Sequence, residues 1–375
     1  MYSPFPTDSG GRKRIVRLAE AMERAGAVPH VLTLHPGPEG EAEARERGWG
    51  YESFAPPAPT PANRARQHAL AEVVPPAPAV RARIRELAPG SAFVQVEEIY
   101  AAQYVHAVRG APAAVSLHNV DSELFASGLE RRALRRRYQA ARMARAERRA
   151  VRRADATLCV SEADRDHFAR AGARAPLLVP NGVDEELFAV PEAVPSNERV
   201  LFFGTLSWRP NAEGLRRFVA EAWPAVRARR PGATLRVAGP RSRERVGDLH
   251  APQDGVEVVG VVPDLAAELA ATRVVVAPLR LGGGTRIKVL EAMAAARPVV
   301  GTSVGVERIG FRHDAHGLVA DTTAGLADGV VRLLEDDALA ARFARDARAA
   351  VQDRRWTATT APAEALYRRW VAAAR

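Results

Sequence analysis

The segment APLRLGGGTRIKVLEAMAAARPVVG, residues 277–301, decides how the rest of this sequence is interpreted. An apolar run precedes it and breaks at Pro278, three glycines follow, and a second apolar run begins after Arg297-Pro298. This pattern predicts a strand, a glycine turn, a helix over 285–296 and another strand, which is one βαβ unit. Such a turn directs free backbone N–H groups and the positive end of the helix dipole at a ligand, and it therefore predicts a phosphate-binding site.

The side chains around this turn strengthen the prediction of an anionic ligand. Thr285 is a candidate N-cap, and Arg286 and Lys288 add cations to the first turn, where the helix dipole favours acids. An anion bound there would offset both effects. Glu291 lies at i+3 from Lys288. The alternative is an ordinary loop with a solvated cationic turn, in which Glu291 is a helix-surface charge.

The composition is that of a soluble globular protein. The chain has 375 residues, 47% of them apolar and 26% charged, which suits two α/β domains. No apolar run reaches the roughly 18–20 residues that span a bilayer, and the first residues lack a secretory pattern. Cys159 is the only cysteine. We therefore expect a cytoplasmic protein, and a peripheral position at the inner face of the plasma membrane stays open.

The positive charge is concentrated in one segment. The formal net charge is +10, and residues 131–153 hold eleven arginines against one acid, Glu147. Two interpretations stay open: a solvated face of a long helix over 122–154, or a surface that docks onto anionic lipid headgroups. A nucleic-acid partner is not expected, because no aromatic residues are interleaved with the arginines and no recognised nucleic-acid motif is present.

Lysine is almost absent, and its two positions are informative. Lys13 and Lys288 each follow a glycine turn, Gly10-Gly11 and the turn at 282–284. A compact ammonium on a flexible stem suits a phosphate at such a loop.

Predicted strands and helices alternate on both sides of a Pro-rich stretch, residues 189–198. This order predicts an α/β fold with two Rossmann-like domains. We place the domains at residues 1–190 and 191–355, followed by a helix over 356–375. The chain opens on a loop and a helix, so the first strand of the amino-terminal domain is missing. Either the chain's true start lies further upstream, or the sheet has a gap at its middle.

Seven stretches occur in an order and at spacings that resemble retaining GT-B glycosyltransferases of glycosyltransferase family 4, in particular bacterial members with a GGGTRIK-LEAMA donor loop. They are SPFPTDSGGRKR (3–14), LHNVDSE (117–123), ADATLCVSEAD (154–164), VPNGVD (179–184), FFGTLSWRPNAEGLRRF (202–218), VVGVVPD (258–264) and the segment 278–307. The resemblance implies two Rossmann-like domains that face across a cleft, with a carboxy-terminal helix crossing back to the amino-terminal domain. It also implies transfer without a metal ion or cofactor from a UDP-, GDP- or ADP-linked sugar to a glycan or lipid-linked acceptor.

The resemblance also implies roles for single residues. Glu291 matches the glutamate that holds the ribose hydroxyls, whereas the position of a second, sugar-binding glutamate is Gly283 here. Thr205 and Asn211 stand near the places of the family's Arg and Lys pair, so Lys288, Arg286 or Arg209 would neutralise the diphosphate. His118 matches a histidine that contacts the donor sugar. The remaining predicted donor-binding residues are Gly10, Gly11, Gly283, Gly284 and Thr285.

Two other functions remain as alternatives. The first is a nucleotide-sugar epimerase of the same fold, which would need extra catalytic acids at the cleft. The second is an inactive GT-B protein that acts as a basic membrane-binding or nucleic-acid-binding module. The missing first strand and Gly283 keep this second alternative open.

Overall fold

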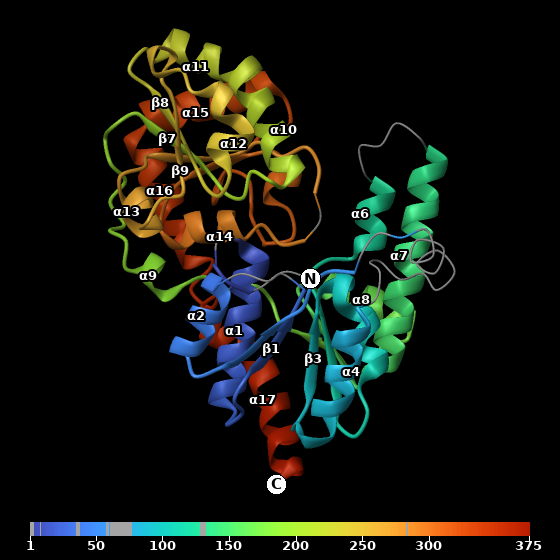
Figure 1. The fold of residues 1–375 in the computed structure, drawn as a ribbon. Helices are drawn as coiled ribbons and strands as arrows, with labels where there is room; N and C mark the ends of the chain where they lie inside the picture. Colours follow the sequence, from blue (N-terminus) through green and yellow to red (C-terminus); the bar gives the residue numbers. More distant parts are fainter. Residues whose placement is uncertain are drawn as a thin grey trace. The chain divides into compact units, whose positions relative to one another are not determined.

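The computed structural model describes residues 4–7, 9–34, 38–57, 60, 77–127, 133–282 and 284–375. The chain divides into two compact units (Figure 1). The amino-terminal unit comprises Met1–Asn181 and Thr359–Arg375, and the carboxy-terminal unit comprises Gly182–Ala358. The first division precedes the predicted boundary at residue 190, because Val183, Leu187 and Val190 already pack into the core of the carboxy-terminal unit.

The described strands of the amino-terminal unit form two separate parallel sheets. One pairs β1 (His30–Thr33) with β2 (Gly50–Ser53), and the other has the order β3-β4-β5-β6. Within the described residues no strand precedes α1 and none joins the two sheets. The strands of the second sheet are β3 (Val94–Glu97), β4 (Ala113–Leu117), β5 (Ala156–Cys159) and β6 (Pro176–Leu178).

Helices cover both faces of this four-stranded sheet, because side chains alternate along each strand. In β4, Val115 and Leu117 pack with α7 and α8, whereas Ala114 packs with α1 and α17. Among the described residues of this unit, the α-helices are α1 (Gly10–Arg24), α2 (Pro38–Glu46), α4 (Pro78–Leu87), α5 (Glu98–Ala101), α6 (Asp121–Ser127), α7 (Ala133–Arg153), α8 (Glu162–Ala171) and most of α17 (Trp356–Ala374), and the 3₁₀ turns are Ala88–Gly90 and Ala102–Ala107.

The carboxy-terminal helix α17 packs against the amino-terminal unit. The ring of Tyr367 stacks on Phe93 with centroids 4.8 Å apart, and its hydroxyl donates to Gln95 at 2.5 Å. Arg24 of α1 forms an ion pair with Glu364 at 2.8 Å. The helix therefore returns to the first unit, as the resemblance implied.

The carboxy-terminal unit contains a six-stranded, wholly parallel sheet of order β12-β11-β10-β7-β8-β9. This is a doubly wound arrangement, in which ligands bind at the carboxyl ends of the strands. The strands are β7 (Arg199–Phe203), β8 (Thr234–Ala238), β9 (Val256–Gly260), β10 (Val274–Ala277), β11 (Val299–Gly301) and β12 (Gly317–Val319).

Strand β7 shows why both faces of this sheet are covered. Val200 and Phe202 pack into the core formed with α10, α11 and α15, whereas Leu201 and Phe203 pack into the core formed with α14. The helices are α9 (Glu185–Phe188), α10 (Arg209–Arg217), a π-helical turn (Phe218–Ala222), α11 (Trp223–Arg229), α12 (Ser242–Val246), α13 (Leu265–Ala270), α14 (Ile287–Ala294), α15 (Thr323–Glu335) and α16 (Asp337–Ala349), with 3₁₀ turns at Gly247–Leu249, Pro252–Asp254 and η6 (Val304–Val306).

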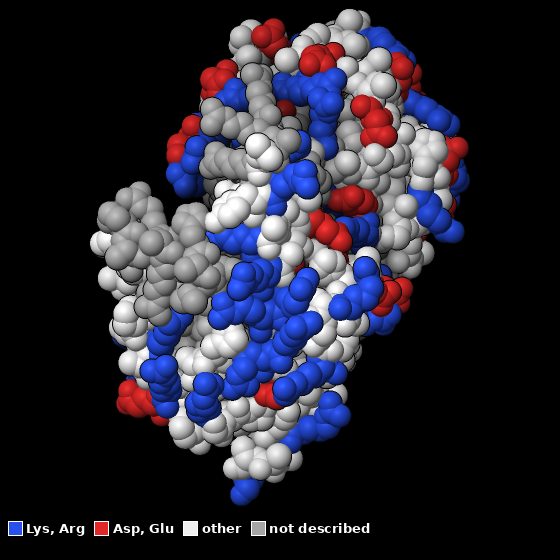
Figure 2. Space-filling view, turned by 90° about the vertical axis from the view of Figure 1, so that its right-hand side faces the viewer, with Lys and Arg blue, Asp and Glu red and all other residues white. Residues whose placement is uncertain are grey.

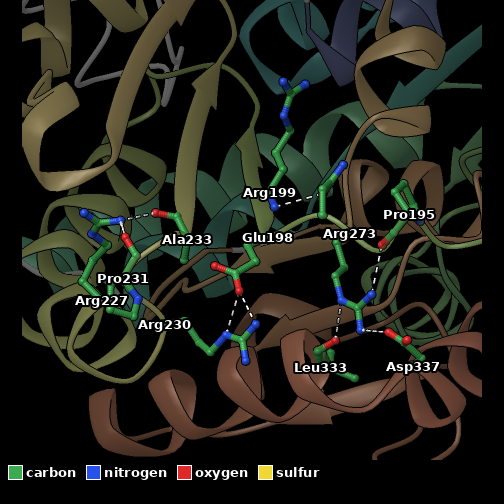
Figure 3. A network of polar contacts seen from close by, with 11 residues as sticks. Pro195, Glu198, Arg199, Arg227, Arg230, Pro231, Ala233, Arg273, Leu333 and Asp337 are labelled. Carbon is green, nitrogen blue, oxygen red and sulfur yellow. Dashed lines mark hydrogen bonds and ion pairs between the residues drawn. The ribbon is translucent and has the colours of Figure 1, made fainter.

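A network of hydrogen bonds and ion pairs lies at the amino ends of these strands (Figure 3). Arg273, directly before β10, is buried and donates to the carbonyls of Leu333 at 2.8 Å and Pro195 at 3.0 Å, and pairs with Asp337 at 2.5 Å. Glu198, directly before β7, binds Arg230. These arginines are satisfied within the fold, so they stabilise the end of the sheet opposite to the one where ligands bind in this architecture.

Two predicted helices match observed elements with shifts of one or two residues at their ends. The helix predicted over 285–296 is α14, Ile287–Ala294, and the long helix over 122–154 corresponds to α6 and α7, with residues 128–132 outside the described residues. Strand β2 was not predicted, because Gly50–Ser53 is polar and only partly buried.

Candidate functional site

The predicted glycine turn lies at the carboxyl end of β10, directly before α14. Gly282 and Gly284 have φ values of +145° and +73°, which an L side chain rarely adopts. The prediction that Thr285 caps the helix was wrong: the N-cap is Arg286, and its side chain makes no capping hydrogen bond. The Thr285 hydroxyl is instead buried, with no hydrogen-bond partner in the described part of the chain. Gly283 lies outside the described residues.

Lys288 is held at this end of the sheet by Asn211. Its Nζ donates to Oδ1 of Asn211 at 2.8 Å and lies 4.3 Å from the centroid of the Phe202 ring. Asn211 is buried, and its Nδ2 donates to the Thr205 carbonyl at 2.9 Å, so its oxygen faces the ammonium. Burial, and secondarily the nearby charge of Arg286, lower the pKa of Lys288 to about 7. Thr205 and Asn211 therefore orient the lysine, although neither carries a charge.

The backbone beside Lys288 can approach closely because two glycines stand there. Gly204 directly follows β7 with φ +136°, and a Cβ on it would lie 3.6 Å from Cδ of Lys288. Gly239 directly follows β8, and a Cβ on it would lie 2.2 Å from the Gly204 carbonyl oxygen. The carboxyl ends of β7, β8 and β10 thus form a tight backbone surface around the lysine.

The other predicted donor-binding residues of this unit occupy different environments. Glu291 is only 6% exposed, so the alternative that it is a helix-surface charge is wrong. Arg286 is buried and pairs with Glu307 at 2.7 Å. Arg209, at the start of α10, pairs with Glu213 at 2.6 Å and has a side chain 69% exposed. The structure therefore brings together Gly284, Thr285, Arg286 and Lys288 by position on one loop and helix start, and it leaves the Arg209 guanidinium at the surface.

The predicted residues of the amino-terminal unit also meet at strand ends. Gly10 and Gly11 begin α1, and a Cβ on Gly11 would lie 3.3 Å from Oε1 of Glu98 and 3.5 Å from Nδ1 of His118. His118 follows β4, while Glu97 and Glu98 stand at the end of β3. Glu98 has φ +64°, a strained value for a residue with a side chain. We did not predict this cluster from the sequence. A usable signal was present, because strand β3 leads directly into two acids, Glu97 and Glu98.

His118 lies between two carboxylates. Its Nε2 is 2.9 Å from Oε2 of Glu97, and its Nδ1 forms an ion pair at 3.3 Å with Oε1 of Glu98. Burial alone would lower the pKa of His118, but the two carboxylates outweigh it and raise the pKa to about 9. Close by, burial and the charges of Glu147 and Glu98 raise the pKa of Asp121 to about 7. His118 is thus an imidazolium at neutral pH, unsuited to act as a general base.

Helix α7 is amphipathic, with its arginines outward. Met143, Glu147, Ala150 and Val151 are buried, and Glu147 accepts from the Ser122 hydroxyl at 2.6 Å. The single acid of this segment is therefore inside the unit. Blue side chains cover much of the face shown in Figure 2, on the side of Figure 1 where α7 lies. Among the side chains of α7 that the structure describes, the exposed arginines are Arg137, Arg145, Arg148, Arg149 and Arg152.

Neither a metal-ion cluster nor a membrane-spanning helix is found in the described part of the chain. The described residues contain no group of three or more His, Cys, Asp or Glu side chains that could hold a metal ion. Among these same residues, no helix has the length and the apolar character needed to cross a membrane.

Two Rossmann-like domains, the second with a glycine loop at the carboxyl end of its parallel sheet, are the architecture of the GT-B fold. Family comparison agrees with this class: residues 9–187 match the model described as Glycosyltransferase Family 4, and residues 197–336 match Glycosyl transferases group 1. The chain belongs to this glycosyltransferase family. No curated protein sequence matches it.

Solved structures share the fold over nearly the whole chain. Sucrose-phosphate synthase from Thermosynechococcus elongatus is 19% identical, with a TM-score of 0.69 over 99% of this chain and 97% of that one. HepE from Anabaena, solved with UDP, is 19% identical, with a TM-score of 0.67 over 93% and 95%. A glycosyltransferase from Rickettsia africae is 12% identical, with a TM-score of 0.65 over 97% and 96%.

Proposed function

We propose that this glycosyltransferase moves a sugar from a nucleotide-sugar donor to a glycan or lipid-linked acceptor, with retention of the anomeric configuration and without a metal ion. The observation that carries the proposal is Lys288, whose ammonium is held by Asn211 beside a glycine loop at a helix start. A partly buried amine whose pKa is lowered costs stability in the free protein, and a bound diphosphate would offset that cost.

In this proposal the carboxy-terminal unit binds the donor. Lys288 donates to diphosphate oxygens, backbone N–H groups of the loop around Gly284 add further donors, and Glu291 accepts hydroxyls of the ribose. HepE has been solved with UDP and with UDP-glucose, which makes UDP the first nucleotide to test.

The proposed chemistry needs no side-chain nucleophile. The bond between the anomeric carbon and the leaving phosphate oxygen breaks, and the acceptor oxygen attacks from the same face. The acceptor proton passes to the leaving phosphate oxygen. His118, whose imidazolium is paired with Glu97 and Glu98, is expected from the resemblance to contact and orient the transferred sugar, not to supply net positive charge.

The first experiment measures the thermal shift of the protein with UDP, GDP and ADP, followed by donor hydrolysis across nucleotide sugars. We expect one nucleotide to stabilise the wild type, and Lys288→Ala and Glu291→Ala to remove that stabilisation. Arg217→Gln, which breaks a pair with Glu221 on a helix surface, is the control and retains it. If none of the nucleotides stabilises the protein, the result counts against both enzyme functions and favours the inactive GT-B protein. Full nucleotide binding by Lys288→Ala would contradict the assignment of the site.

A second experiment determines the stereochemistry of the product. Proton NMR of the first turnovers distinguishes retention from inversion by the coupling constant of the new anomeric proton. An inverted product would contradict the retaining mechanism while leaving donor binding intact.

We also propose that α7 contacts an anionic membrane surface. Its exposed arginines lie on one side of the helix, and Leu134 and Tyr138 near its start are 80% and 49% exposed, so cations adjoin apolar groups. Replacing Arg145, Arg148, Arg149 and Arg152 with Gln should abolish co-sedimentation with vesicles that contain phosphatidylglycerol. Replacing the exposed Arg229, Arg241, Arg243 and Arg345 of the other unit is the charge-matched control. Equal binding to neutral vesicles would refute the electrostatic contact.

A further inference from the structure

Glu307 has no role in the proposed function, yet it binds one of the predicted donor-site residues. Its Oε1 lies 2.7 Å from Nη2 of Arg286, and Nε of Arg286 donates to the Val304 carbonyl at 2.9 Å. The Arg286 side chain is only 4% exposed. Arg286 precedes α14, whereas Val304 and Glu307 follow β11, so this side chain ties together the segments after two neighbouring strands.

The ring of Trp208 lies beside the same guanidinium. The guanidinium carbon of Arg286 lies 5.9 Å from the centroid of the Trp208 ring. A Cβ on Gly282 would lie 2.6 Å from Cη2 of Trp208 and 3.0 Å from Nη1 of Arg286. The indole and the guanidinium therefore both pack against the side of Gly282 where a side chain would stand.

The segment that carries Glu307 is itself held firmly. Gly305, in η6, donates its N–H to the Thr302 hydroxyl at 2.9 Å, and Thr302 in turn binds the Leu279 carbonyl. A Cβ on Gly305 would lie 2.0 Å from the Ala277 carbonyl oxygen. This close backbone contact gives Glu307 a rigid base at the end of β10.

We propose that Arg286 is a positioning residue, not a diphosphate ligand, and that Glu307 and Trp208 act with it to hold the glycine loop in its donor-binding shape. The carboxylate of Glu307 already neutralises the guanidinium, and burial leaves Arg286 little surface to offer a ligand. Lys288 is then the cation that faces the diphosphate. This inference rests on the proposed function for its nucleotide, but the shape of the loop can be tested in the free protein.

The first test is amide hydrogen exchange of the free protein, followed by mass spectrometry. Glu307→Gln leaves the buried charge of Arg286 without its carboxylate, and Arg286→Gln removes the bonds to Val304 and Glu307. Each variant should therefore speed exchange about ten-fold in peptides covering 278–287. Peptides covering β8, in the same unit, report whether the fold is otherwise intact. Trp208→Phe, which keeps an aromatic ring, should give a smaller effect. Unchanged exchange in Glu307→Gln, or a loop already unprotected in the wild type, would overturn the inference.

The second test separates positioning from ligand contact. It compares binding of the nucleoside diphosphate that stabilises the wild type, among UDP, GDP and ADP, with binding of the matching monophosphate. We expect Arg286→Gln, Glu307→Gln and the double variant each to weaken diphosphate binding by the same factor, about ten-fold. All three variants break the same Arg286–Glu307 pair, so their effects should not add. Glu221→Gln, which breaks the exposed pair with Arg217, should have no effect.

A direct ligand role would give a different result. Arg286→Gln would then weaken diphosphate binding far more than Glu307→Gln does and would leave monophosphate binding unchanged. That result would overturn the positioning role while preserving the proposed function. If the wild type binds none of the nucleotides, the proposed function fails, and hydrogen exchange still decides whether Glu307 holds the loop.

Discussion

Nζ of Lys288 donates a hydrogen bond to Oδ1 of Asn211 at 2.8 Å, across 77 positions of sequence. The amide is the right partner for a lysine that must bind an anion. It orients the ammonium without cancelling its charge, whereas a carboxylate would compete with the diphosphate. The neighbouring cation, Arg286, has such a carboxylate in Glu307.

The pKa of Lys288 predicts that donor binding takes up a proton. Its pKa is about 7 in the free protein, and a bound diphosphate would raise it. Below pH 7 the amine is already charged; above pH 7 it must be protonated, so affinity should fall up to about ten-fold per pH unit. Titration calorimetry in buffers of different ionisation enthalpy measures the uptake. Lys288→Arg, always charged, should show none, and equal affinity of the wild type at pH 6.5 and 8.5 would contradict the prediction.

Replacing Asn211 should weaken nucleotide binding at the donor site. Asn211→Ala removes the acceptor for Lys288 and the donor to Thr205, so we expect about a ten-fold loss of nucleotide affinity. Asn211→Asp supplies a competing carboxylate; it should raise the pKa of Lys288, abolish the proton uptake and also weaken binding. Calorimetry with the selected diphosphate checks both variants. Wild-type affinity in Asn211→Ala would show that the amide does not orient the lysine.

The raised pKa of His118 predicts a fall in stability toward alkaline pH. The folded pKa is about 9 against an ordinary value of 6.5, so the stabilisation is fully present below pH 6.5 and is lost as pH rises through 9. It amounts to at most about 3 kcal/mol. Urea unfolding of the wild type from pH 6 to 9.5 measures the loss, and His118→Gln should flatten the profile. A profile in that variant as steep as the wild type's would assign the pH dependence to other groups.

Gly239 should not tolerate a side chain. A Cβ there would lie 2.2 Å from the Gly204 carbonyl oxygen, and its φ of +134° is unfavourable for alanine. We expect Gly239→Ala to lower the free energy of unfolding by about 2 kcal/mol or more. Gly247→Ala is the matched control, because a Cβ on Gly247 has no heavy atom within 4 Å. Thermal unfolding of both variants makes the comparison, and equal melting temperatures would show that the strand ends can move apart.

The class of fold and the place of the glycine loop follow from the amino-acid sequence alone. Apolar runs alternating with helical periods predict parallel sheets, and a glycine turn before a helix marks where backbone N–H groups are free. The residues of the segment 277–301 therefore suffice to indicate a phosphate-type loop, and Lys288 lies close to it as expected. The same reasoning groups Arg286 with Lys288, because both are cations in one turn.

The difference between these two cations arises from tertiary contacts. Lys288 faces an amide and Arg286 faces a carboxylate. Both partners come from segments that follow other strands: Asn211 lies in α10 after β7, and Glu307 follows β11. Likewise, Glu97 comes from the strand beside the one that His118 follows. Parallel strands bring residues distant in the sequence to one edge of a sheet, so the partners depend on strand order and register. The local sequence pattern determines whether each segment forms a helix or a strand. The charge that a side chain presents to a ligand depends instead on its partners from other segments of the chain.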